Sequence, residues 1–217
     1  MTALNFLQID TGGNPETTII WLHGLGANGH DFEPVVPEFA FAKARPVRFL
    51  FPHAPDLPVT INGGMVMPAW YDILAMDIDR KVDVDQLRLS AHRVAALIQA
   101  ERERGVASEN IILGGFSQGG AVAYELALSY PEPLGGLFAL STYFATADSI
   151  KLHEANRNLP IFIGHGSVDP VVPEALGQAA LEKLQALGYE PEYHGYYMEH
   201  SLCMEEIRDL DSFWRGV

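Results

Sequence analysis

Residues 111–120 read Ile-Ile-Leu-Gly-Gly-Phe-Ser-Gln-Gly-Gly, so a run of β-favouring apolar residues leads into one serine surrounded by glycines. The centre of this stretch, Gly115-Phe116-Ser117-Gln118-Gly119, has the pattern G-x-S-x-G between a predicted strand and a predicted helix. A strand-to-helix turn this sharp strains the backbone of its serine and favours residues without side chains two positions before and after it. The alternative is a glycine-rich turn with an incidental serine. The flanking strand and helix favour a nucleophilic Ser117.

Short apolar runs alternate with longer helical patterns along the chain. The predicted strands are residues 18–22, 47–51, 111–113, 136–141, 160–164 and 192–198, and the predicted helices are residues 84–104, 118–130, 174–187 and 203–214. One face of the first helix collects Leu87, Ala91, Val94, Leu97 and Ile98. This alternation predicts an α/β fold with a mainly parallel central sheet and helices on both faces. In such sheets, functional residues gather at the carboxyl ends of the strands.

Length and composition narrow the classes of function. The length of 217 residues is typical of one α/β domain, so we predict a single domain over residues 1–217. The formal charge of −14 disfavours nucleic acid and anionic membrane surfaces as partners. The N-terminal residues lack the features of a signal peptide, and no run approaches the roughly 20 apolar residues of a membrane helix. Cys203 is the only cysteine, which excludes an internal disulfide and favours a cytoplasmic location.

A nucleophilic serine needs a base, and the base needs an acid that orients it. In folds with this turn, the acid and then the histidine follow the serine along the chain. His200 comes just after the last predicted strand, whereas His194 lies inside that strand and is committed to one sheet face. Asp169 directly follows a buried strand in a glycine-shaped loop, and Asp148, after the preceding strand, is the alternative acid. We therefore predict Ser117, Asp169 and His200 as a catalytic triad.

Acyl transfer also requires hydrogen-bond donors for the developing oxyanion. His23-Gly24-Leu25-Gly26 follows a predicted strand at the place where the second donor of such a site is expected. We predict the backbone N–H groups of Leu25 and Gln118 as the donors. Cys203 lies three residues past His200, but its helical position favours a buried small side chain over a nucleophile. The sequence has no phosphate-binding glycine loop and no metal-spaced His/Cys cluster, so no metal site is predicted.

The connection between the second main strand and the long helix, residues 53–74, is long for a loop and is therefore a candidate for function. It contains Gly63-Gly64-Met65-Val66-Met67-Pro68-Ala69-Trp70-Tyr71-Asp72. We predict that Met67 and Trp70 form part of the wall of an apolar acyl site, because methionine adapts to irregular ligands. The alternative is a small apolar cluster under a loop.

Four stretches together resemble the phospholipase/carboxylesterase family of α/β-hydrolases: residues 23–26, 68–72, 114–120 and 166–173. That family includes small bacterial carboxylesterases and acyl-protein thioesterases, and residues 60–70 resemble the bacterial carboxylesterase branch most closely. The resemblance implies an α/β-hydrolase fold, the triad Ser117–Asp169–His200 and oxyanion donors at Leu25 and Gln118. It also implies esterase activity without a cofactor and the capacity to form homodimers.

The sequence therefore predicts a serine carboxylesterase that hydrolyses carboxylic esters through an acyl-enzyme intermediate. An acyl-protein thioesterase or lysophospholipase with the same triad is the alternative among enzymes. A catalytically silent hydrolase fold that serves as a binding module is the alternative from another class, and the complete triad disfavours it. One position departs from the family pattern: Glu199 precedes His200, where the family usually has glycine or another small residue.

Overall fold

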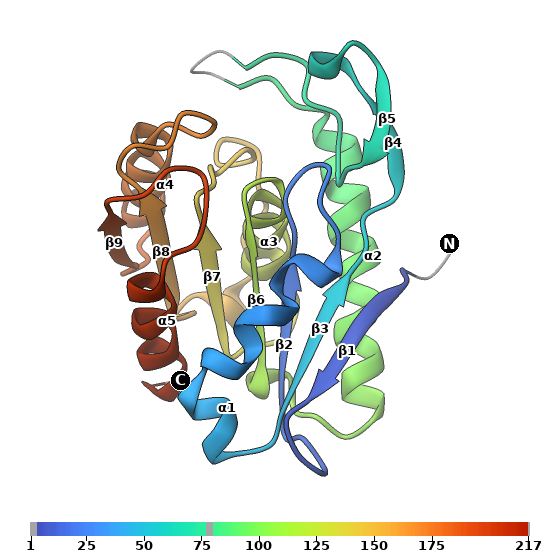
Figure 1. Ribbon diagram of the computed structural model, residues 1–217, viewed down its shortest axis with the longest axis vertical. Coiled ribbons are helices and arrows are strands. Elements are labelled where there is room, and N and C mark those ends of the chain that lie inside the picture. The colour runs from blue at the N-terminus through green and yellow to red at the C-terminus, as the bar shows by residue number, and fades with distance from the viewer. Residues whose placement is uncertain (1–3, 77–79, 217) are drawn as a thin grey trace.

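The structure is a computed structural model that describes residues 4–76 and 80–216, so both ends of the predicted domain lie outside the described residues. Its central feature is a seven-stranded sheet with the strand order β1-β3-β2-β6-β7-β8-β9 (Figure 1). β1 runs antiparallel to β3, and the other neighbours are parallel. The mainly parallel sheet of the predicted α/β fold is confirmed. The strands are β1 (Phe6–Asp10), β2 (Thr17–Leu22), β3 (Val47–Pro52), β6 (Ile111–Phe116), β7 (Gly136–Leu140), β8 (Ile161–Gly166) and β9 (Glu192–Tyr196).

Helices cover both faces of the sheet (Figure 1), because successive residues of each buried strand point to opposite sides. In β2, Ile20 and Leu22 contribute to the core under α2, α3 and α4, whereas Ile19 and Trp21 contribute to the core under α1 and α5. Within the described ranges, no helix has the length and apolar character needed to cross a bilayer. The helices are α1 (Ala40–Ala44), α2 (Val84–Glu103), α3 (Gln118–Ser129), α4 (Glu174–Ala186) and α5 (Met204–Gly216).

The predicted strands and helices are all present, and their ends differ from the predicted ends by a few residues. The sequence patterns missed the edge strand β1, the short helix α1 and the 3₁₀ segment Gly29–Glu38, which contains Pro34 and Pro37. Proline lacks the N–H group that a regular helix requires, so this segment shows no helical pattern. The connection 53–74, which we predicted to be a loop, forms a hairpin of β4 (Asp56–Val59) and β5 (Met65–Pro68).

The parallel strands place the predicted functional loops at one edge of the sheet. The carboxyl ends of β2, β6, β8 and β9 point upward in Figure 1, and the β4–β5 hairpin stands above them. The connections that follow these strands contain residues 23–26, 117, 167–173 and 197–203. Residues far apart in the sequence therefore meet at this edge.

A buried carboxyl group lies on the α5 face of the sheet. Glu206 of α5 is fully buried beside Gly164 of β8, and neither of its carboxyl oxygens has a hydrogen-bond partner in the part of the chain that the structure describes. Burial, and to a lesser extent the charge of Asp209, raises the pKa of Glu206 from 4.5 to about 8. Glu206 is therefore largely protonated in the folded protein at neutral pH.

We expect Glu206 to make the folding stability depend on pH. Between pH 4.5 and about 8 the folded protein holds a proton that the unfolded chain releases, so the free energy of unfolding falls as the pH rises through this window. Glu206→Gln stays neutral and should remove this slope. A rise of the pKa from 4.5 to about 8, at about 1.4 kcal/mol per pKa unit, puts the gain in the free energy of unfolding at alkaline pH on the order of 5 kcal/mol.

Urea denaturation at acidic and at mildly alkaline pH measures this effect. The neighbouring side chain of Glu205 is exposed, so Glu205→Gln is the matched control and should keep the wild-type slope. Equal slopes in Glu206→Gln and the wild type would contradict the prediction.

Candidate active site

Ser117 occupies the tight turn between β6 and α3. Its backbone angles, φ 55° and ψ −122°, lie outside the regions that residues with side chains favour. Gly115 and Gly119 make this turn sterically feasible. A Cβ atom on Gly115 would lie 2.5 Å from the carbonyl carbon of Gly119, and a Cβ atom on Gly119 would lie 2.5 Å from the carbonyl oxygen of Leu22. The turn therefore requires glycine at both positions, as the G-x-S-x-G pattern predicts.

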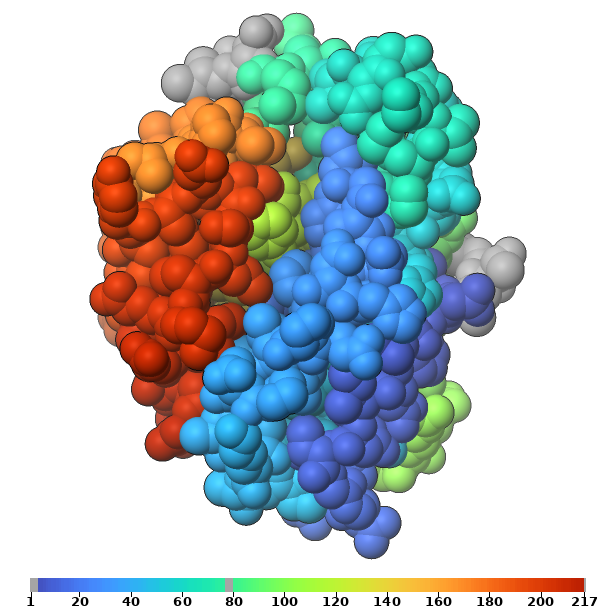
Figure 2. Space-filling view, in the orientation of Figure 1, coloured from blue at the N-terminus to red at the C-terminus, as the bar shows by residue number. Residues whose placement is uncertain are grey.

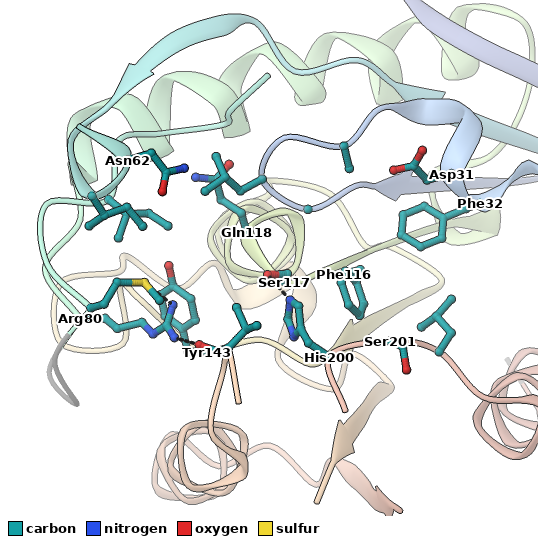
Figure 3. Close-up of a pocket in the computed structure, with 18 of the residues that line it drawn as sticks. Asp31, Phe32, Asn62, Arg80, Phe116, Ser117, Gln118, Tyr143, His200 and Ser201 are labelled. Atoms are coloured by element: carbon teal, nitrogen blue, oxygen red, sulfur yellow. Dashed lines mark hydrogen bonds between the residues drawn. The ribbon is translucent and has the colours of Figure 1, made fainter. Parts of the chain in front are cut away.

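Ser117, His200 and Asp169 form a continuous chain of hydrogen bonds. Ser117 Oγ lies 3.0 Å from His200 Nε2 (Figure 3), and His200 Nδ1 lies 2.6 Å from Asp169 Oδ2. An ionised carboxylate only accepts hydrogen bonds, so Nδ1 carries the proton and Nε2 offers its lone pair to the serine hydroxyl. The structure thus brings the three predicted triad residues together in the order that activates a serine nucleophile.

The surroundings of Asp169 hold its carboxylate in place. Asp169 Oδ1 accepts hydrogen bonds from the N–H groups of Val171 and Val172, each at 2.8 Å, which leaves Oδ2 for His200. His165 supports the same loop, because its Nε2 donates to the carbonyl oxygen of Val172 at 2.8 Å. Burial lowers the pKa of His165, which keeps this imidazole neutral at pH 7.

The alternative acid and the alternative histidine both lie elsewhere. The Asp148 side chain is 87% exposed and pairs with Lys183 Nζ at 2.7 Å. His194 lies on β9 at the edge of the sheet, where its ring stacks on Phe162 and its Nδ1 is 3.5 Å from an oxygen of Asp209. Neither side chain takes part in the hydrogen-bonded chain that ends at Ser117.

Two backbone N–H groups beside Ser117 are available as donors. Leu25 and Gln118 both line the cavity at Ser117, and neither N–H group donates a hydrogen bond to an acceptor within residues 4–76 and 80–216. The N–H group of Gln118 is at the start of α3, where the helix dipole contributes positive potential. The loop of Leu25 also lies against the serine, since a Cβ atom on Gly24 would lie 3.4 Å from Ser117 Cβ. The two predicted donors are therefore both adjacent to the serine.

Ser117 opens into a cavity of about 560 Å³. The space-filling view shows a hollow between the blue N-terminal loop, the red C-terminal segment and the teal hairpin (Figure 2). In the close-up, Asn62, Arg80 and Tyr143 lie on one side of Ser117 and Asp31 and Phe32 on the other (Figure 3). The volume falls in the range of small-ligand sites, roughly 300–1,000 Å³. The apolar and aromatic lining residues are Leu25, Ala27, Phe32, Val35, Ile61, Ile73, Met76, Phe116, Tyr143, Val171 and Leu202.

Met67 and Trp70 do not line this cavity, which corrects the predicted pocket wall. Trp70 is only 1% exposed, and its indole Nε1 donates to the carbonyl oxygen of His23 at 2.8 Å. The sulfur of Met67 lies 3.3 Å from Asn62 Nδ2 and faces Gly26. Trp70, just after the hairpin, is thus directed at the loop of His23, and Met67 lies beside Asn62 and Gly26. Ile61 and Asn62 reach the cavity instead.

Several lining residues were not identified from the sequence. Tyr143 follows β7, and its place beyond the carboxyl end of a parallel strand is a signal that a sequence analysis can use. Phe32 lies in the proline-containing 3₁₀ segment and Arg80 lies beyond the hairpin, so no local pattern marks either of them. Arg80 donates to the carbonyl oxygen of Val171, and its guanidinium lies 5.0 Å from the centre of the Tyr143 ring, so it borders one end of the cavity.

Glu199, which departs from the family pattern, has an exposed side chain. Its carbonyl oxygen accepts a hydrogen bond from the N–H group of Ser201 at 2.9 Å, so its backbone shapes the turn that carries His200. A carboxylate in solvent is screened by water and salt, which limits its effect on the imidazole.

Comparisons with known proteins match nearly the whole chain. The family model described as Phospholipase/Carboxylesterase matches residues 6–216. Acyl-protein thioesterase 1 of Gibberella zeae is 39% identical over 91% of this chain and 89% of its own length. Acyl-protein thioesterase 1 of Saccharomyces cerevisiae is 40% identical over 90% of this chain and 90% of its own length. The crystal structure of Arabidopsis thaliana SOBER1 is similar with a TM-score of 0.86 at 33% identity, covering 92% of this chain and 98% of that chain.

More distant structures share the fold. A carboxylesterase of Bacillus cereus has a TM-score of 0.78 at 20% identity, covering 98% of this chain and 94% of that chain. The family model and the similar structures agree with the α/β-hydrolase fold described above. The chain therefore belongs to the phospholipase/carboxylesterase family of α/β-hydrolases and is a hydrolase that acts on ester or thioester bonds.

Proposed function

We propose that this protein is a serine thioesterase that removes acyl groups from thioesters, with Ser117 as nucleophile, His200 as base and Asp169 as the orienting acid. The observation that carries the proposal is the hydrogen-bonded chain from Asp169 to Ser117 beside an apolar cavity. Acyl transfer to serine requires a base within hydrogen-bond reach of the hydroxyl and space for the acyl group next to it.

In this mechanism, Ser117 Oγ attacks the carbonyl carbon of the thioester while its proton passes to His200 Nε2. The N–H groups of Leu25 and Gln118 stabilise the resulting oxyanion. The C–S bond then breaks, the leaving sulfur takes the proton from His200, and the acyl group stays on Ser117. Water attacks this acyl-enzyme and gives a proton to His200, which returns it to Ser117 as the carboxylic acid leaves.

The names of the relatives support a thioester as the substrate. The Gibberella zeae and Saccharomyces cerevisiae proteins are both acyl-protein thioesterases, and each aligns with this chain over most of its length. The carboxylesterase predicted from the sequence is the second candidate, because the same triad attacks the carbonyl carbon of an oxyester. A cytoplasmic location, which the single cysteine favours, is part of the proposal.

The position of His200 suggests which side of the cavity receives the acyl chain. His200 gives its proton to the leaving group, so the leaving group departs on the side of the imidazole. The imidazole packs against Phe116 at 4.6 Å between ring centres, and Phe116 in turn lies 6.1 Å from Phe32. We therefore propose that the side near Phe32 receives the leaving group and that the side near Ile61 receives the acyl chain.

A panel of matched thioesters and oxyesters with acetyl, octanoyl and palmitoyl chains tests the function. We expect kcat/KM to be highest for long-chain thioesters, because an apolar acyl chain gains about 0.8 kcal/mol for each methylene it buries. Ser117→Ala should lose turnover by about 10³-fold or more together with labelling by an organophosphonate, while circular dichroism stays unchanged. A preference for oxyesters at every chain length would replace the thioesterase by the carboxylesterase, and normal labelling of Ser117→Ala would exclude both.

Substitutions at two aspartates test which of them is the acid of the triad. Asp169→Asn should lower kcat by about 10³–10⁴-fold, because an amide at this position favours the wrong tautomer of His200. Asp148→Asn is the control, and its exposed position predicts kcat within about twofold of the wild type. Steady-state kinetics compares them, and a large loss in Asp148→Asn with a small loss in Asp169→Asn would contradict the assignment.

Filling one side of the cavity should change the preference for chain length. Ile61→Trp occupies the proposed acyl side and should lower kcat/KM for the palmitoyl thioester at least about tenfold more than for the acetyl thioester, because pocket contacts are worth ~1–3 kcal/mol each. Val35→Trp fills the other side and is the matched control, since Val35 lies in the same segment as Phe32. If only Val35→Trp changes the palmitoyl-to-acetyl ratio of kcat/KM, the two sides are assigned the wrong way round.

A further inference from the structure

Residues 68–71, which we call the brace, connect the loop of one predicted oxyanion donor to the turn of the other. On the first side, the carbonyl oxygen of Pro68 accepts a hydrogen bond from the N–H group of Gly26 at 2.8 Å. The indole Nε1 of Trp70 donates to the carbonyl oxygen of His23 at 2.8 Å. Gly26 and His23 flank Leu25 in the sequence. The brace is therefore bonded to the chain on both sides of the Leu25 N–H group.

On the second side, the brace is bonded to Gln118. The side-chain Oε1 of Gln118 accepts from the N–H group of Trp70 at 2.7 Å, and its Nε2 donates to the carbonyl oxygen of Tyr71 at 2.7 Å. Gln118 is buried, so these bonds do not compete with bulk water. The side-chain amide that is hydrogen-bonded to the brace and the second donor N–H group therefore both belong to Gln118.

The brace itself is anchored in the body of the fold. Ser90 of α2 donates to the carbonyl oxygen of Trp70 at 2.5 Å. His23, which receives the indole bond, is fixed in turn, because its Nδ1 donates to Gly24 O at 2.7 Å and its Nε2 accepts from the N–H group of Ala54 at 3.0 Å. Burial lowers the pKa of His23, which keeps it in the neutral form that this pair of bonds requires.

We propose that Trp70 is a positioning residue of the oxyanion hole, holding the Leu25 N–H group at a fixed place relative to that of Gln118. The inference rests on the proposed acyl-transfer function. Oxyanion donors accelerate the reaction only when they are held before charge develops, at roughly 2.7–3.1 Å from the place where the oxyanion forms. A loop that loses the indole bond must reorganise during the reaction, which weakens binding of the transition state more than binding of the substrate.

The same bonds explain why the aromatic side chain of Trp70, just after the hairpin, is buried beside the site without lining the cavity. Two other buried indoles, Trp21 and Trp214, pack in the core on the opposite face of the sheet, and neither Nε1 has a hydrogen-bond partner among the described residues. An apolar core thus accommodates an indole without using its N–H group in this protein. At Trp70 the N–H group is used, and its acceptor is in the loop of Leu25.

The test compares Trp70→Phe with Trp214→Phe, which loses a buried indole of the same size whose N–H group has no hydrogen-bond partner within residues 4–76 and 80–216. The readouts are kcat and KM for an acetyl ester that the wild type hydrolyses, and the Ki of a trifluoromethyl ketone that forms a tetrahedral adduct with serine. We expect Trp70→Phe to lower kcat by about tenfold to a hundredfold, with KM within about twofold and Ki raised in parallel. Trp214→Phe should lower the Tm and leave kcat and Ki unchanged.

A second variant covers the case in which Trp70→Phe does not fold. Replacing the indole of Trp70 by the isosteric benzothiophene keeps the shape of the ring and removes only the N–H donor, and we expect the same changes in kcat and Ki. Unchanged kcat and Ki in this variant would overturn the proposal and leave Trp70 as a core residue. The test uses an ester that the wild type hydrolyses. If the substrate panel shows no preference for thioesters, the kcat and Ki of the Trp70 variants on this ester therefore still test the role of Trp70.

Discussion

The whole site depends on one backbone constraint, the strained conformation of Ser117, with a positive φ, at the end of β6. A residue with a side chain adopts φ 55° only when its surroundings impose it, and here strand β6 and helix α3 approach closely enough to do so. The strand and the helix can approach this closely only because Gly115 and Gly119 have no Cβ atoms. The same turn places the hydroxyl at the carboxyl edge of the sheet and leaves the first N–H group of α3 without an intrahelical partner. The positions of the nucleophile and of one oxyanion donor therefore both follow from this one turn.

Around this turn, the other groups are held by short loops whose polar atoms are bonded to each other. The carboxylate of Asp169 uses one oxygen for two backbone N–H groups and the other for His200, so its orientation is determined by the loop after β8. His165 and His23 are buried, neutral histidines that each satisfy a loop carbonyl. Neither of them is in the hydrogen-bonded chain to Ser117, although the sequence offers them as histidines at strand ends. Their part is to fix the backbone that carries the groups near the serine.

The assignment of Trp70 illustrates why composition is a weak guide to a pocket wall. An apolar, aromatic stretch in a long connection is typical of a ligand site, and the stretch is indeed next to the cavity. In the structure, however, β4 and β5 pair as a hairpin, with Ile61 and Asn62 in the connection between the two strands and Trp70 just after β5. Ile61 and Asn62 reach the cavity, whereas Trp70 is bonded to the loop of Leu25. The direction of each side chain depends on contacts with segments far away along the chain, such as the bond from Trp70 to His23, and no local pattern indicates them.

By itself, the sequence determined the α/β class, the parallel strands of the central sheet with its longer helices, and the identities of Ser117, Asp169 and His200 as the candidate triad. It did so because burial on both faces of a parallel sheet requires continuous apolar strands, and because the serine turn requires glycines at two fixed positions. Only the tertiary structure decided that Asp148 points to solvent, that Phe32, Tyr143 and Arg80 border the cavity, and that Trp70 is bonded to the oxyanion loop. These facts depend on distances between segments far apart along the chain, and such distances are determined by packing rather than by local propensity.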